Sequence, residues 1–194
     1  MRIVKYPHPT LLHRSRELKL VDRELRKAIA EMFELMYEHQ GIGLAANQVD
    51  LPYRVFILNV TGDPAVKDEE HVLINPTILK RSGNMVEADE GCLSFPGIYA
   101  PVRRAEHIVA VAYNLAGEEV QYAVDGLFAR AFQHEHDHLD GKLFIERLTP
   151  SHLLNIKDDL LALEAEFSGD RRRGVMPDER QIVARLTELE RLRT

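Results

Sequence analysis

The chain has 194 residues, the size of one ordinary domain with a short appendage. Hydrophobic residues make up 45% and charged residues 29%, which is typical of a globular protein and not of a disordered one. The net charge of −6 argues against non-specific nucleic-acid binding, and no apolar run approaches the roughly 20 residues of a membrane span. The start of the chain lacks an apolar signal region, so we expect a cytoplasmic protein.

The first half of the chain predicts one helix and then two strands. Apolar side chains recur at helical spacing after Asp22, a candidate N-cap, and Gly41 is the candidate end of this helix. The apolar run 55–60 predicts a buried strand. Residues 71–79 predict a second strand, and Pro76 makes it an edge strand or a bent one.

The next part predicts a hairpin followed by a helix. Residues 107–113 and 119–124 predict two strands joined by a hairpin loop. Residues 126–139 predict a helix with Gly141 at its far end. Because strands and helices do not alternate regularly, the predicted fold class is α+β rather than a doubly wound sheet.

Two amphipathic helices are predicted in the C-terminal part. One spans 151–167 and the other begins near Asp178, with a breaker stretch at 168–174 between them. The chain therefore divides into a main domain, 1–167, and a linker with a C-terminal amphipathic helix, 168–194. The apolar stripes of these helices favour packing within the chain, and a homodimer contact is the alternative.

Residues 134–138 read His-Glu-His-Asp-His, a spacing typical of a metal site. Positions four apart share a helical face, so His134 and His138 can bind one ion together. Glu135 is offset from both, which suits a base that contacts a metal-bound water. His136 points away from them and is predicted to face solvent or to add a local charge. The alternative for this segment alone is a solvated, histidine-rich helix end.

The lone cysteine, Cys92, is the best candidate for a third ligand. It lies in the segment 90–97, whose glycines and proline predict a tight, exposed turn. A structural cysteine more often lies in a plain apolar run. Three protein ligands would leave one coordination position for water, as in catalytic zinc sites.

A third segment, 41–49, is rich in glycine and alanine and ends near Gln48. Its glycines would let a substrate backbone approach closely, and the Gln48 amide could donate to a developing oxyanion. The alternative is a helix end that leads into a tightly packed turn.

Together, the three segments resemble the signature motifs of the peptide deformylase family. Residues 41–48 match GxGxAAxQ, residues 90–94 match EGCLS and residues 133–141 match QHExDHLxG, in the family's order. The resemblance spans about 1–150. It implies antiparallel or mixed β-sheets packed around a central helix that carries HExxH, with additional C-terminal helices.

The resemblance also implies a reaction, the hydrolytic removal of the formyl group from the N-terminal formylmethionine of new polypeptides. Cys92, His134 and His138 match the metal ligands, and Glu135 matches the general acid and base that acts on a metal-activated water. Fe(II) is the expected native ion, with Zn or Ni as substitutes.

Further residues match positions that contact the substrate. The Gln48 side chain and the backbone N–H of Leu93 match the oxyanion donors. The peptide-binding positions, whose backbone would hold an extended strand, are Ile42, Gly43 and Gly91. Leu127 and Ala131 share the helical face of His134, and with Ile42 they are predicted to line the methionine pocket.

The expected partners are N-formylmethionyl nascent peptides and, transiently, the ribosome, and the chain is expected to be a monomer or a homodimer. Arg130 is predicted to brace Glu90, and two unlinked surface charges are the alternative. Two other functions stay open. One is a zincin-type endopeptidase, which would need a later ligand such as His152; the other is a non-catalytic metal-binding or ribosome-associated protein.

Overall fold

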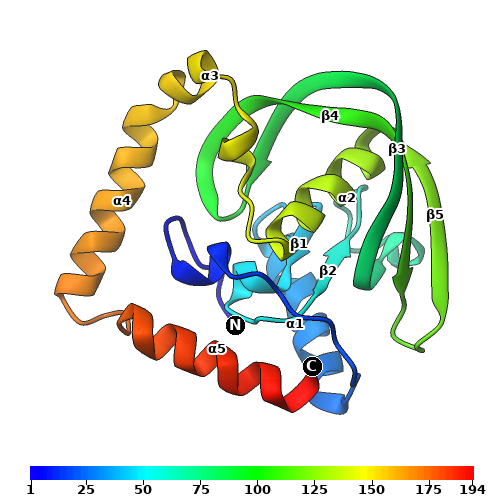
Figure 1. The fold of residues 1–194 in the computed structure, drawn as a ribbon, viewed down its shortest axis with the longest axis horizontal. Coiled ribbons are helices and arrows are strands. Elements are labelled where there is room, and N and C mark those ends of the chain that lie inside the picture. Colours follow the sequence, from blue (N-terminus) through cyan, green and yellow to red (C-terminus); the bar gives the residue numbers. More distant parts are fainter.

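A computed structural model describes all 194 residues. The chain forms one antiparallel sheet with helices around it (Figure 1). The strands follow one another in the sheet in chain order: β1 (Gly43–Ala45), β2 (Val55–Leu58), β3 (His71–Cys92), β4 (Phe95–Tyr113) and β5 (Glu119–Asp125). The α-helices are α1 (Arg23–Glu38), α2 (Gly126–Leu139), α3 (Pro150–Asn155), α4 (Lys157–Arg172) and α5 (Glu179–Arg193). Short 3₁₀ helices are η1 (Pro9–Leu12), η2 (Ala46–Val49), η3 (Lys67–Glu69) and η4 (Phe144–Arg147). The α+β class is confirmed, with a single antiparallel sheet.

The longest strands, β3 and β4, form a curved ribbon that belongs to two separate cores (Figure 1). The first part of β4, residues 95–102, packs with α4, and the later part, 108–112, packs with α2 and β2. Shifts in register, such as the one between Ser82 and Met85, bend the ribbon between these cores. Cys92 pairs with Phe95 where the two strands meet, so the ribbon presents Cys92 at its tight end.

The predicted strand at 71–79 is the beginning of β3. The edge position predicted for it is wrong, because β3 lies between β2 and β4. The predicted bend is present, since the register shifts between Ile74 and Thr77 around Pro76. The β4–β5 hairpin is confirmed, whereas β1 and the strand residues 80–92 and 95–106 were not predicted.

The helix α1 begins as its sequence predicts and ends one residue earlier than predicted. The Asp22 carboxylate accepts a hydrogen bond from the Leu25 N–H at 2.8 Å, which confirms the N-cap. The left-handed residue after the helix is Gln40, with φ 56°, and not Gly41. The Gly41 N–H donates to the Met36 carbonyl at 2.8 Å, which completes a Schellman motif.

The helix α2 spans the predicted residues and lies against β1, β2 and β4. Its apolar side buries Ala129, Phe132 and Leu139. The prediction that His136 faces solvent or adds a charge is wrong. The His136 side chain is only 11% exposed beside Arg54, and burial lowers the pKa of its imidazole to about 4.

The C-terminal helices differ from the prediction in their boundaries. The predicted helix 151–167 is two helices, α3 and α4, separated at Ile156. The predicted breaker at 168–174 is wrong for its first residues, because α4 continues to Arg172. The division of the chain at 167 stays a prediction, and it falls inside α4.

The apolar stripes of α4 and α5 pack within the chain. Leu160 and Leu163 of α4 and Ile182 and Leu186 of α5 are buried, whereas Leu153 of α3 is 40% exposed. The start of α5 is confirmed, since Asp178 caps it. In Figure 1, α5 runs beside the N-terminal segment and ends near α1. A homodimer contact stays a prediction.

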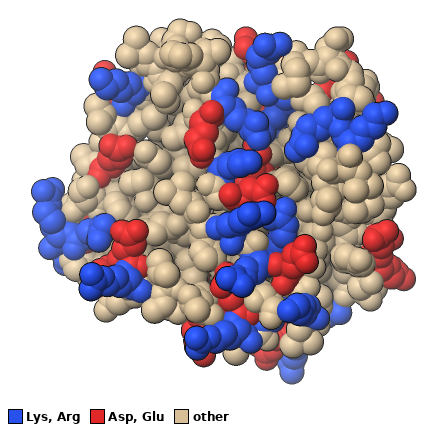
Figure 2. All heavy atoms as spheres, in the orientation of Figure 1, with Lys and Arg blue, Asp and Glu red and all other residues tan.

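The surface charges are mixed. In Figure 2, basic and acidic side chains alternate over the face in view, without a large area of either sign. None of the helices combines the length and the apolar composition that crossing a membrane requires.

Substitution by alanine is predicted to cost different amounts of folding stability at two glycines that share a positive φ. Gly117 and Gly141 both have positive φ, 81° and 70°, but a Cβ on Gly141 would lie 2.5 Å from the Leu12 carbonyl oxygen, and one on Gly117 would meet nothing within 4 Å. We expect Gly117→Ala to lower the free energy of unfolding by about 1 kcal/mol and Gly141→Ala by about 2–4 kcal/mol. Urea unfolding of both variants checks this, and equal losses would contradict the steric argument.

Candidate active site

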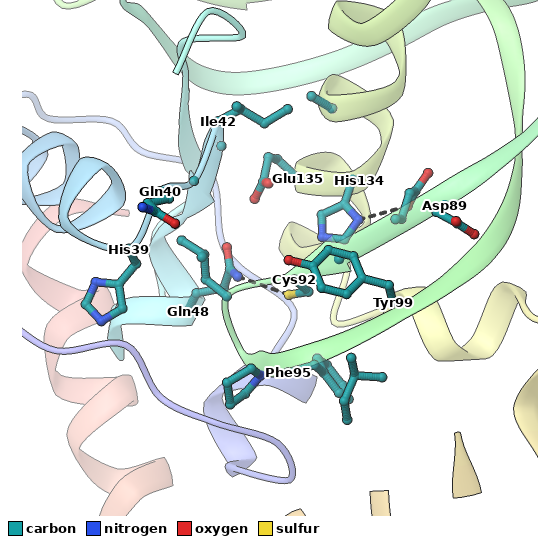
Figure 3. Close-up of a pocket in the computed structure, with 18 of the residues that line it drawn as sticks. His39, Gln40, Ile42, Gln48, Asp89, Cys92, Phe95, Tyr99, His134 and Glu135 are labelled. Carbon is teal, nitrogen blue, oxygen red and sulfur yellow. Dashed lines mark hydrogen bonds and ion pairs between the residues drawn. The ribbon is translucent and has the colours of Figure 1, made fainter. Parts of the chain in front are cut away.

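A cleft of about 510 Å³ contains side chains from all three motif segments (Figure 3). Every predicted site residue except His138 lines it: Ile42, Gly43, Gln48, Gly91, Cys92, Leu93, Leu127, Ala131, His134 and Glu135. His138 is 1% exposed and lies behind the cleft surface. The fold therefore brings the three segments to one place, with α2 on one side and the end of the β3–β4 ribbon on the other.

Cys92, His134 and His138 form the one group of three or more potential metal-binding side chains in the chain. Their donor atoms all lie within 4.8 Å of one another, and Cys92 Sγ is 3.3 Å from His138 Nε2. Neighbouring sulfur and nitrogen ligands of a tetrahedral zinc ion lie about 3.6 Å apart. The donor set and its spacing therefore fit a divalent ion. His152, the ligand that a zincin would need, is not in the group.

The two histidines differ in their protonation. Burial alone would lower the pKa of His134, but hydrogen bonds with Cys92 and Glu90 raise it to about 10. Burial, together with the charge of His134, lowers the pKa of His138 well below its ordinary value. A metal ion bound at His134 would replace a proton of its imidazole, since ligand binding and protonation compete.

Glu90 orients His134 and is itself held by two arginines. Its Oε2 accepts a hydrogen bond from His134 Nδ1 at 3.0 Å, which leaves Nε2 free to face Cys92. Arg104 donates to both carboxylate oxygens at 2.9 and 2.8 Å, and Arg130 donates to Oε1 at 2.7 Å. The predicted contact between Arg130 and Glu90 is thus confirmed. Burial alone would raise the pKa of Glu90, but the hydrogen bonds from Arg104 and His134 keep it well below its ordinary value.

Arg104 is a supporting residue that the sequence analysis missed. Its side chain is 3% exposed and also pairs with Asp137 of α2, which in turn pairs with Arg147. A buried arginine must have its charge compensated, and here two carboxylates do so. The sequence carries no clear signal for this role, because Arg104 is one of two consecutive arginines in a charged part of β4.

Glu135 lies close to β1 and has one free carboxylate oxygen. A Cβ at Gly43 would lie 2.6 Å from Glu135 Oε1, so only glycine leaves room for the carboxylate at this point. The other oxygen, Oε2, is buried and has no hydrogen-bond partner. Burial raises the pKa of Glu135 to about 7. A buried, unpaired carboxylate is rare in structural positions and is suited to proton transfer.

Gln48 lies in η2 with its amide directed at the cysteine (Figure 3). Its Oε1 accepts a hydrogen bond from the Ala45 N–H at 2.8 Å, which orients the side chain. Its Nε2 then lies 3.3 Å from Cys92 Sγ and 3.4 Å from Ser94 Oγ. The amide is therefore a fixed donor at the cluster, and its neighbour Leu93 lines the cleft beside Cys92.

The lining of the cleft includes residues beyond the predicted catalytic, metal-binding and substrate-binding ones. The Tyr99 ring is part of this lining, and the residue is 68% exposed. A Cβ at Gly91 would be 2.4 Å from this ring, so a glycine is needed there. Other lining residues of this kind include His39, Gln40 and Asp89.

Comparison with known proteins identifies the family. A sequence model described as polypeptide deformylase matches residues 1–153. The peptide deformylase of Rhodopirellula baltica is 40% identical over 194 residues, which are 100% of this chain and 96% of that protein. A Neisseria meningitidis peptide deformylase is 46% identical over 149 residues, covering 77% of this chain and 87% of that one.

Solved structures agree with the sequence comparison. A crystal structure of plant peptide deformylase 1B has a TM-score of 0.85 and 40% identity, over 92% of this chain and 95% of that one. A peptide deformylase from Plasmodium falciparum has a TM-score of 0.84 and 36% identity, over 87% of this chain and 98% of that one. The chain belongs to the peptide deformylase family of hydrolases, which remove the formyl group from nascent polypeptides.

Proposed function

We propose that this chain hydrolyses the formyl group from N-terminal formylmethionine with a divalent ion held by Cys92, His134 and His138, and that Glu135 carries the protons. Family membership supports the class of reaction. The observation that carries the mechanism is the placement of three donor atoms within 4.8 Å beside a buried carboxylate with an unpaired oxygen.

The ion supplies the electrophilic part of the chemistry. When bound, a divalent ion lowers the pKa of a water molecule and polarises the formyl carbonyl group. We propose Fe(II) as the native ion, with Zn or Ni as substitutes, since a set of one thiolate and two imidazoles accepts each of them. The thiolate ligand makes loss of activity in air the expected behaviour of the Fe(II) protein.

Glu135 moves the proton in both halves of the reaction. Its free Oε2 takes a proton as the water oxygen bonds to the formyl carbon. The bond between the formyl carbon and the methionine nitrogen then breaks, and Glu135 returns the proton to that nitrogen. The products are formate and a free amino terminus. A pKa of about 7 lets one carboxyl group act as base and then as acid near neutral pH.

The remaining predicted residues bind and orient the substrate. The Gln48 amide and the Leu93 N–H are positioned to stabilise the oxygen of the formyl group as it gains charge. The peptide continues as an added strand along Gly43 and Gly91, which have no side chains of their own. The methionine side chain of the substrate lies against Ile42, Leu127 and Ala131. Because Leu127 is 52% exposed, Leu127 contacts the outer end of the methionine side chain.

The two alternative functions have less support. For a zincin-type endopeptidase, this chain lacks the downstream metal ligand, because His152 is not part of the donor group. A non-catalytic metal-binding protein would not need the buried, unpaired Glu135 oxygen or the oriented Gln48 amide. Transient ribosome contact, the oligomeric state and cytoplasmic residence stay predictions from the sequence.

The proposed reaction is tested by formate release from a formylmethionyl peptide, using protein loaded anaerobically with Fe(II). We expect turnover by the parent and a loss of about 10³-fold or more in kcat for Glu135→Gln, because the proton carrier is removed while the metal ligands remain. Metal analysis of the same samples must show equal occupancy. The matched control is Glu87→Gln on the exposed face of β3, which should keep parental kcat. No formate from a metal-loaded parent would overturn the proposed function.

Glu90 gives a second prediction, on metal affinity. Glu90→Gln keeps the shape of the side chain but removes the charge that orients His134 and compensates Arg104, so the affinity for the ion should fall about 10–100-fold. Competition with a chelator, starting from metal-free protein, measures this. The control is Glu87→Gln, the same substitution at an exposed glutamate of β3 that does not line the cleft. Equal affinities for Glu90→Gln and the parent would contradict the proposed role of Glu90.

A further inference from the structure

The short helix η2, which carries Gln48, ends in an unusual backbone conformation. Asp50 follows η2 with φ 66° and ψ 33°, in the left-handed region that residues other than glycine rarely adopt. Such a residue persists only where its surroundings hold it in place. The contacts of Asp50 therefore determine how firmly the end of η2 is fixed.

Two side chains from distant parts of the sequence hold Asp50. Thr10 donates its hydroxyl proton to Asp50 Oδ1 at 2.6 Å. Arg185 of α5 forms an ion pair with the same carboxylate oxygen and also donates to the Asp50 backbone carbonyl at 3.2 Å. The guanidinium group thus contacts both the side chain and the main chain of the residue that ends η2.

Arg185 extends from a helix that is itself firmly docked. Ile182 and Leu186, on either side of it in the sequence, are 2% and 1% exposed. Further along α5, Glu190 hydrogen-bonds His13 at 2.8 Å, and Arg193 donates to the Tyr53 hydroxyl at 2.7 Å. The position of Arg185 is therefore set by packing over the length of α5.

The η2 residues that precede Asp50 reach the proposed metal ligands directly. The Gln48 amide points at Cys92 Sγ, and the Asn47 side-chain amide donates to the backbone carbonyl of His138. Val49 is buried in the core against which Leu189 of α5 packs. A shift of η2 would consequently move the Gln48 amide relative to Cys92.

We propose that Arg185 is a positioning residue for the hydrolysis, which acts through Asp50 to keep η2, and with it the Gln48 amide, directed at the reacting carbonyl oxygen. The proposal rests on the proposed function, since it takes Gln48 as the oxyanion donor. It gives α5, which lies beyond residues 1–153 matched by the family, a part in supporting the active site.

The first test compares Arg185→Met with Arg191→Met. Arg191 lies on the same helix, is 74% exposed and forms an ion pair with the exposed Glu188, so its variant controls for charge and for helix content. We expect Arg185→Met to lower kcat for formate release about three- to tenfold, because small displacements of an aligned group are costly, with KM and metal content unchanged. Arg185→Lys should recover part of the loss, and Arg191→Met should match the parent.

The second test asks whether the effect passes through Gln48. In a Gln48→Ala background, Arg185→Met should cause no further loss of kcat, because the group that it positions is gone. The same fold loss in both backgrounds would overturn the proposal. So would a lower melting temperature with unchanged kcat, which is the result expected of a residue that only docks α5.

A third measurement does not depend on turnover or on the metal. Hydrogen–deuterium exchange of the backbone amides of residues 46–51 in metal-free protein should be faster in Arg185→Met than in the parent and unchanged in Arg191→Met. Equal exchange rates would overturn the proposal while leaving the proposed function intact. No formate from the metal-loaded parent would instead overturn the proposed function and, with it, the role of Arg185 in the reaction.

Discussion

The buried carboxylate of Glu90 connects the parts of the active site. It receives hydrogen bonds from Arg104 on β4 and from Arg130 and His134 on α2, although it lies on β3 itself. Removing charges from water is costly, and this cost is offset only when every charged group is paired with good geometry. The position of Cys92, two residues further along β3, is thereby fixed relative to His134, whose donor atom lies within 4.8 Å of the cysteine sulfur.

The parts of the fold that the sequence predicted are those with local causes. The span of α2 follows from apolar spacing, the start of α1 from the Asp22 cap, and the β4–β5 hairpin from its turn residues. The later half of β3 could not be predicted, because its side chains are largely exposed and show no alternation of apolar and polar residues. Its strand conformation comes from pairing with β4, which is not a local property.

The candidate site divides in the same way. Cys92, His134 and Glu135 could be identified because residue type, spacing and family motifs all point to them. Arg104 could not, because its role comes from neighbours that folding supplies. Arg104 is 14 residues from Glu90 along the chain, and nothing in the sequence distinguishes it as the buried one of the pair Arg103-Arg104. Reacting groups can thus be identified from sequence patterns more readily than the supporting groups that hold them in place.

The docking of α5 also bears on how the chain is made. The hydrogen bond between His13 and Glu190 joins residues 177 positions apart, so the segment around His13 acquires this contact only after α5 has been synthesised. Chains fold largely in the order of synthesis, and contacts of long separation form late. A protein whose family acts on newly made chains therefore holds its own N-terminal segment without this support until α5 has been translated and packs beside that segment.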